Sequence, residues 1–251
     1  RQMCIRDSHT PQPARLGIMA AMPQELDAFL QAMPDEAVTT MAGRDFWCGH
    51  WRGHEVVAVL SGIGKVAASI TATTLIQHFG VRRLMFTGVA GGLAPHVKVG
   101  DVVVASELLQ HDLDASPLFP RFELPGRGIS RIPSCPVLRH ALVAAARQSL
   151  SLTAGEQVHE GLIVSGDRFI ASRQAVQGLR EALPDALAVE MEGAAIAQVC
   201  LDFDVPFGVV RSISDRADDD AHVDFLRFVT DVASPHALAM VDHTLQHLSP
   251  P

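Results

Sequence analysis

Two clusters of polar residues stand where short apolar runs end, and both could carry acid–base chemistry. The first lies in residues 209–215, where a run rich in Val, Ile and Ser contains Arg211 and ends at Ser214 and Asp215. Open α/β sheets bind ligands at the carboxyl ends of their strands. An arginine and an aspartate at that place fit a binding site better than a core. The simplest alternative for Asp215 is an N-cap of the next segment.

The second cluster is Glu190 and Glu192, where a short apolar strand passes into a helix predicted over 191–203. We expect these two carboxylates to point to opposite sides of the strand end, so that one serves the structure and the other a ligand. A third carboxylate, Glu25, follows a first strand at 16–22, with no arginine close by in the sequence. It could be an exposed residue favoured by the helix dipole, or a general base.

A sheet is needed to bring these residues together, and the hydrophobic pattern predicts one. Strand-like runs alternate with helical patterns, which favours a single-domain, three-layer α/β fold with a central mixed sheet flanked by helices. The further expected strands are 55–60, 84–87, 101–106 and 158–164, and the further expected helices are 65–79 and 236–248.

Two segments are expected to interrupt the alternation. Gly88, Gly91 and Gly92 are predicted to end the strand at 84–87, because glycine allows a turn and a close approach of the backbone to a ligand. Residues 111–133 contain four prolines and little periodicity. A loop of that length in a compact domain is usually functional or part of an interface.

The bulk composition limits the class of protein. With 251 residues, 48% of them hydrophobic and 19% charged, the chain fits one globular domain. A net charge of −8 argues against nucleic acid as a partner, and no apolar run approaches the roughly 20 residues that cross a bilayer. Four cysteines without CxxC spacing and no signal-peptide core indicate reduced thiols in a cytoplasmic protein.

The amino-terminal residues differ from the rest of the chain. They lack periodicity and precede a clean first strand. We expect residues 1–13 to be non-native or disordered, and residues 14–251 to form the domain.

Neither the glycine turn at 62–65 nor the histidines indicate a nucleotide triphosphate or a metal. A Walker A motif needs glycine six residues before its lysine and Ser or Thr after it, but Val59 and Val66 stand there. The turn is therefore interpreted as a strand-to-helix connection that could also wall a site. The twelve histidines show no metal-ligand spacing, and His111 beside Asp112 is interpreted as a loop anchor. We expect no metal and no organic cofactor.

Six segments, in order, resemble the nucleoside phosphorylase/nucleosidase superfamily, and most closely its methylthioadenosine/S-adenosylhomocysteine nucleosidases. They are 16–22, 61–68, 87–95, 161–167, 189–197 and 209–215. The resemblance implies hydrolysis of the N-glycosidic bond of 5′-methylthioadenosine, S-adenosylhomocysteine and related 5′-substituted adenosines. The products would be adenine and a 5-substituted ribose, as in methionine salvage and nucleoside catabolism.

The resemblance also implies residue roles. Asp215 would protonate adenine N7, Glu25 would activate water on the opposite face, and Glu192 would bind the ribose hydroxyls, an arrangement that parallels inverting glycosidases. A carboxylic acid at a partly desolvated strand end can keep its proton near neutral pH. The other implied contacts are Arg211 at the water or sugar, Ser214 orienting Asp215, Met191 and Met22 at the sugar, Phe169 stacked on the purine, Ile170 at its edge, Ile63 and Val89 beside the ligand, and Phe225 along the alkylthio group.

Three alternatives stay open. A phosphorylase of the superfamily would hold phosphate with an arginine and a serine, but Phe86 and Val89 stand at those positions, which favours water as the nucleophile. Many nucleosidases also keep that serine. A futalosine-type nucleosidase is the second alternative. The third alternative is a non-catalytic nucleoside-binding protein. Such a protein need not retain the acid and the base, so their presence in this chain argues against it.

The resembled family forms homodimers in which a loop of one subunit closes the site of its neighbour. The proline-rich segment 115–122 is the candidate for that loop. The expected partners are therefore a nucleoside substrate and a second copy of the chain.

Overall fold

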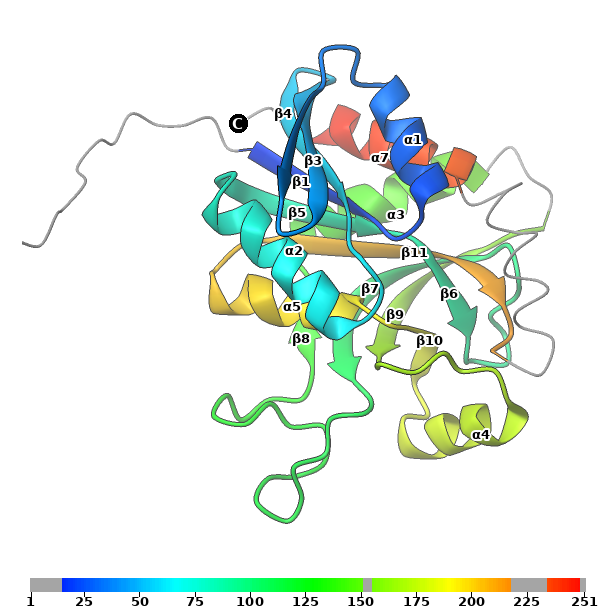
Figure 1. The fold of residues 1–251 in the computed structure, drawn as a ribbon. Helices are drawn as coiled ribbons and strands as arrows, with labels where there is room; N and C mark the ends of the chain where they lie inside the picture. The colour runs from blue at the N-terminus through cyan, green and yellow to red at the C-terminus, as the bar shows by residue number, and fades with distance from the viewer. Residues whose placement is uncertain (1–14, 151–154, 218–233, 249–251) are drawn as a thin grey trace, which may run out of the picture.

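The computed structural model describes residues 15–150, 155–217 and 234–248. Within these ranges the chain forms one mixed sheet of eleven strands with helices on both faces (Figure 1). The strands are β1 (Arg15–Ala20), β2 (Ala37–Met41), β3 (Arg44–Trp51), β4 (His54–Leu60), β5 (Val81–Thr87), β6 (Val89–Gly92), β7 (Val102–Gln110), β8 (Ile132–Pro133), β9 (Val158–Ser165), β10 (Ala186–Glu190) and β11 (Phe207–Asp215). The helices are α1 (Pro23–Gln31), α2 (Lys65–Gln77), α3 (Pro136–Leu150), α4 (Arg173–Ala182), α5 (Gly193–Asp202) and α7 (Ser234–His247).

The strand order is β2-β3-β4-β1-β5-β11-β6-β10-β9-β7-β8, with a further pairing of β11 to β7. β11 holds this arrangement together, because it pairs with β5 through 207–209, with β7 through 210–212 and with β6 through 212–215. All nine of its residues are buried. The three-layer fold with a central mixed sheet, expected from the sequence, is confirmed.

The core has one half on each face of the sheet, because adjacent residues of a strand point to opposite sides. Met85 of β5 packs with Leu142 and the rest of the cluster beneath α1, α3 and α7. The next residue, Phe86, packs with Leu75 and Ile196 beneath α2 and α5. Figure 1 shows these two groups of helices on either side of the sheet, with α4 beside β9 and β10. The site at the strand ends therefore rests on a rigid support.

The structure differs from the expected elements at two places. Gly88 does separate β5 from the next strand, with φ +156°, but Gly91 and Gly92 take no part in that break. They are the last two residues of β6, which pairs with β11 and β10. The helix predicted over 191–203 begins two residues later, so that Glu192 is its N-cap. The expected loop at 111–133 is confirmed apart from the two residues of β8 and one bridge, Leu124 to Ile129.

Two other expectations concern the ends and the environment of the chain. Residues 1–14 lie outside the described residues, so the interpretation of the amino-terminal segment stays a prediction. None of the helices in the described part is long and apolar enough to span a membrane.

The packing of α3 on β11 gives a test of the fold. A Cβ added at Gly208 would lie 2.7 Å from Cδ1 of Leu142 and 3.2 Å from Cβ of Leu138, so Gly208→Ala should destabilise the protein by about 1–3 kcal/mol through overpacking. Gly178 lies on the exposed side of α4 with no atom within 4 Å of an added Cβ. Gly178→Ala should therefore stabilise it by about 0.5–1 kcal/mol. Denaturant unfolding gives the change in the free energy of unfolding for each variant. Changes of the same sign in the two variants would contradict this packing.

Candidate active site

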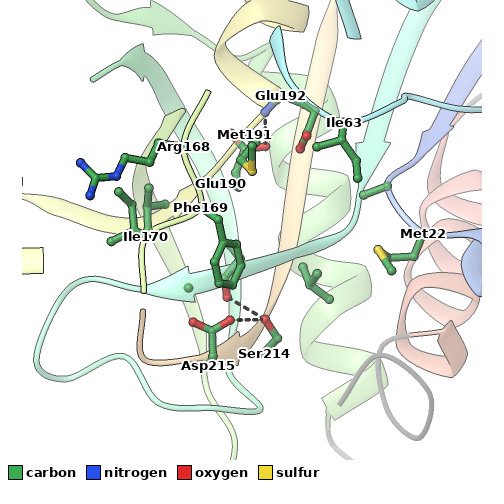
Figure 2. A pocket seen from close by; sticks show the side chains of 15 residues that line it. Met22, Ile63, Arg168, Phe169, Ile170, Glu190, Met191, Glu192, Ser214 and Asp215 are labelled. Carbon is green, nitrogen blue, oxygen red and sulfur yellow. Dashed lines mark hydrogen bonds between the residues drawn. The ribbon is translucent and has the colours of Figure 1, made fainter. Parts of the chain in front are cut away.

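A cavity of about 380 Å³ opens beside the first residues of β6, where β10 and β11 end. Figure 2 shows Asp215 and Ser214 on one side of it and Glu192 and Ile63 on the other. The lining side chains come from segments far apart in the sequence and are Ala21, Met22, Ile63, Val89, Ala90, Gly91, Arg168, Phe169, Ile170, Val189, Glu190, Met191, Glu192, Ser214 and Asp215. The volume suits a small molecule, and the lining is mostly apolar with a few convergent polar groups, which is typical of ligand sites.

Most residues that the sequence singled out line this cavity. They are Met22, Ile63, Val89, Phe169, Ile170, Met191, Glu192, Ser214 and Asp215. Glu25 and Arg211 are buried behind its wall, at 1% and 0% exposure. Phe225 lies outside the described residues.

Asp215 stands at the last position of β11 and is 2% exposed. Its Oδ2 accepts a hydrogen bond of 2.7 Å from the hydroxyl of Ser214, as expected for a residue that orients the carboxyl group. Its Oδ1 accepts the N–H of Ala217 at 2.7 Å, which is the local capping contact considered as the alternative for this aspartate. Both contacts coexist with a place in the cavity wall, so local capping and ligand binding are compatible.

Glu192 is held by the glycine turn that precedes α2. The N–H of Gly64 donates to its Oε1 at 2.9 Å, and Gly64 has φ +88°, a conformation that favours glycine. The turn that resembles a phosphate loop therefore binds a side chain of the site and places Ile63 in the cavity wall. Burial and the negative charge of Glu190 raise the pKa of Glu192 to about 7, against the opposing effect of Arg211.

Glu25 is a buried capping residue and not an exposed one. It lies in the first turn of α1, and its Oε2 accepts the N–H groups of Met22 at 3.0 Å and Ala21 at 3.2 Å. Both donors line the cavity, so the carboxyl group lies directly behind the wall. Burial raises the pKa of Glu25 to about 7, although the positive charge of Arg211 and the two N–H donors act in the opposite direction. A group with such a pKa can exchange a proton near neutral pH.

Arg211 connects the carboxylates behind the cavity. Its guanidinium lies over the ring of Phe86, with Cζ 3.8 Å from the ring centroid. Its Nη2 donates to Glu190 and lies 3.9 Å from Oε2 of Glu192. Within the described ranges, its Nε and Nη1 have no hydrogen-bond partner. The expectation of no arginine near Glu25 therefore holds along the chain but is wrong in space.

The expectation that Glu190 and Glu192 point to opposite sides is also wrong. Glu190 is the last residue of β10, but Glu192 has already left the strand, with φ −135° and ψ −40°. Residues two apart in a strand line the same face in any case, because only successive residues alternate, and both carboxylates turn toward Arg211.

Three loops at the mouth of the cavity are joined by hydrogen bonds. Nζ of Lys65 donates to Asp112 at 2.6 Å and to Gln110 at 3.1 Å. Asp112 also accepts the N–H of Asp167, and Asp167 accepts the N–H of Lys65. Asp112 thus anchors a loop, as the sequence indicated for His111 and Asp112. These hydrogen bonds link the turn that contains Ile63 to the loop that carries Phe169.

Sequence reasoning missed several residues of the cavity. Arg168, Val189 and Ala21 line it without any signal beyond their position next to predicted residues. In Figure 2 the guanidinium of Arg168 is turned away from the other labelled side chains. Glu190 was one of a pair with an open assignment, and the structure places it both in the wall and on Arg211. No three His, Cys, Asp or Glu side chains in the described part come together as a metal site would require.

Known proteins share this fold and sequence over nearly the whole chain. Residues 15–246 match the family model described as the phosphorylase superfamily. A 5′-methylthioadenosine/S-adenosylhomocysteine nucleosidase from Shewanella frigidimarina is 40% identical over 93% of this chain and 100% of that protein. The crystal structure of a 5′-methylthioadenosine/S-adenosylhomocysteine nucleosidase from Neisseria meningitidis in complex with methylthio-immucillin-A has a TM-score of 0.86 at 34% identity, covering 93% of this chain and 99% of that one.

A futalosine hydrolase of Helicobacter pylori is also similar, with a TM-score of 0.83 at 34% identity over 94% of this chain and 98% of that one. The chain belongs to the phosphorylase superfamily, and within it to the 5′-methylthioadenosine/S-adenosylhomocysteine nucleosidases.

The buried Glu25 predicts a dependence of stability on pH. Between its ordinary pKa of 4.5 and its folded pKa of about 7, the folded protein holds a proton that the unfolded chain has lost. The free energy of unfolding therefore falls as the pH rises through this window. Glu25→Gln removes that loss, so its stability relative to the parent should be higher at pH 8 than at pH 5 by on the order of 1–3 kcal/mol.

Urea unfolding at the two pH values checks this prediction. Glu36→Gln, at an exposed glutamate, is the matched control and should show no such difference. A stability difference for Glu25→Gln that stays the same at pH 5 and pH 8 would mean that Glu25 is ionised across the range.

Proposed function

We propose that this protein hydrolyses the N-glycosidic bond of 5′-methylthioadenosine, S-adenosylhomocysteine and related 5′-substituted adenosines. The observation that carries the proposal is one cavity with Asp215 at one side and Glu192 at the other, with Glu25 directly behind its wall. The curated relative and the ligand-bound neighbour named above support the class of substrate. Adenine and a 5-substituted ribose are the products.

In the proposed reaction, Asp215 donates a proton to N7 as the bond to the sugar breaks. Protonation removes the negative charge that would otherwise develop on the adenine leaving group. The Ser214 hydroxyl, 2.7 Å from Oδ2, fixes the rotamer of the acid. Phe169 and Ile170 form the apolar wall beside it, where a purine ring can stack. The proton must come from Asp215 because no other carboxyl group of the described cavity lies on that side (Figure 2).

The sugar and the water are placed at the other side. Glu192 offers two acceptor oxygens to the vicinal ribose hydroxyls, with Met191 and Met22 against the ring. Glu25, whose pKa is about 7, removes a proton from water as it attacks C1′. Nη1 of Arg211 has no hydrogen-bond partner in the described part, and it lies so close to Gly88 that an added Cβ there would be 2.2 Å away. This N–H group is therefore available to support the water from behind.

Water is favoured over phosphate as the nucleophile by the side chains around Gly88. Phe86 is fully buried under the guanidinium of Arg211, and Val89 lines the cavity with an apolar side chain. The charge of Arg211 itself is already paired with Glu190. A phosphate dianion beside Gly88 would therefore meet no guanidinium charge that is not already neutralised.

Adenine release from 5′-methylthioadenosine, measured with and without phosphate, tests the proposal. We expect release at the same rate in both buffers. Release only with phosphate would identify a phosphorylase. Release of the purine base from futalosine but not from 5′-methylthioadenosine or S-adenosylhomocysteine would identify a futalosine-type nucleosidase, and release of a base from none of them would indicate a binding protein.

Asp215→Asn and Glu25→Gln should each lower kcat/KM by about 10²–10⁴-fold, the usual contribution of one general acid or base. Asp27→Asn, at an exposed aspartate on the same helix as Glu25, is the control and should keep the parental rate. Near-full turnover by Asp215→Asn would disprove the assignment of the acid.

We also propose a cytoplasmic homodimer. The free thiols Cys48, Cys135 and Cys200 agree with a reducing compartment. Ile63, Val66 and Ile70 are 80%, 71% and 43% exposed at or along α2, a clustered apolar surface that fits an interface. Leu118 and Phe119, in the loop expected to close a neighbouring site, are also exposed.

Sedimentation velocity at micromolar concentration tests the dimer. Val66→Glu should shift the population toward monomer by placing a charge in the interface. Val137→Glu, at a residue 67% exposed on α3, is the matched control and should not. A monomeric parental protein, or equal effects of the two variants, would contradict the α2 interface.

A further inference from the structure

Glu190 is the carboxylate that the proposed reaction leaves without a task. It lines the cavity but is only 7% exposed. It accepts hydrogen bonds from Nη2 of Arg211 on β11, from the hydroxyl of Ser165 on β9, and from the N–H groups of Glu192 and Gly193 at the start of α5. One side chain therefore joins two strands and a helix directly behind the site.

These bonds fix two groups that the reaction uses. The N–H of Gly193 donates at 2.8 Å and that of Glu192 at 3.1 Å, so Glu190 holds the turn that presents the Glu192 carboxylate. On its other side, Glu190 holds Nη2 of Arg211. The guanidinium then lies over the ring of Phe86, with Nη1 beside Gly88.

We propose that Glu190 is a positioning residue that neutralises Arg211 and thereby sets the protonation of Glu25 and Glu192. This inference rests on the proposed function. Arg211 has one positive charge for three carboxylates, and Glu190 makes the direct ion pair, whereas Glu192 is 3.9 Å away. While Glu190 holds the guanidinium, less of its charge acts on the other two carboxylates, so either can carry a proton near neutral pH.

The charged groups around Glu190 support this assignment. They are Arg211 from β11, Glu192 at the start of α5, Glu25 from α1 through Arg211, and His111 after β7. Arg211 lowers the pKa of both Glu25 and Glu192, and Glu190 raises that of Glu192. The effect of Glu190 on His111 is smaller than that of burial, which lowers the pKa of the imidazole.

Glu190→Gln separates charge from shape. Glutamine keeps the length and one acceptor oxygen but leaves the charge of Arg211 to act on Glu25 and Glu192, so both should become more acidic. Because Glu25 must be ionised to act as a base, the acidic limb of the plot of kcat/KM against pH should shift to lower pH by about one pH unit. Glu190→Asp keeps the charge but is shorter, so it should lower kcat without shifting the acidic limb of the pH profile.

The experiment measures pH profiles of the parent, Glu190→Gln, Glu190→Asp and Glu181→Gln, the last being a charge-matched control at an exposed residue. A lower rate of Glu190→Gln with an unmoved limb would show a merely structural role and overturn the proposal. So would a limb that moves equally in Glu181→Gln.

A second measurement needs neither substrate nor a folded Glu190→Gln variant. The carboxyl ¹³C resonances of labelled glutamates in the parental protein report each proton directly. We expect the Glu25 and Glu192 carbons to titrate between pH 6 and pH 9. Ionisation of both groups below pH 6 would overturn the proposal. If the parent releases no adenine, the proposed function fails, yet these titrations still decide the role of Glu190.

Discussion

The burial of one guanidinium among carboxylates is the constraint on which the rest of this structure depends. Arg211 is wholly out of water, in the middle of a strand whose nine residues are all buried. A buried charge without a partner costs about 3–5 kcal/mol, so β10 and the start of α5 must bring Glu190 and Glu192 to it. The sheet meets this requirement because β11 pairs with both β5 and β6, which places β10 one strand further on.

The same constraint accounts for the unusual protonation at the site. One positive charge cannot hold several buried carboxylates ionised, so burial raises the pKa of Glu25 and of Glu192 to about 7 despite the guanidinium. Asp215 is treated differently, since it receives a hydroxyl and an N–H of its own at the tip of β11. The carboxyl groups on the two sides of the cavity are thus held by separate donors.

Much of this could be predicted from the sequence, because polar residues at the ends of apolar runs indicate a site in an α/β protein. Asp215 and Glu192 stood out in this way, whereas Phe169 was implied only by the family resemblance. The pairing of Glu190 with Arg211 could not be predicted, since it depends on sheet closure between residues 21 apart. β2 also gives little signal, because it is almost wholly exposed and shows no alternation.

The end of β10 at Glu190 has a functional sense. Residues two apart in a strand line the same face, and Glu192 stays near Arg211 although it has already left the strand. The chain leaves the sheet at Glu190, and the N–H groups freed at the start of α5 are satisfied by the Glu190 side chain. Glu192 then turns over the cavity, where Gly64 fixes it from the opposite loop. The end of one strand therefore builds both the sugar-facing carboxylate and the anchor of the arginine behind it.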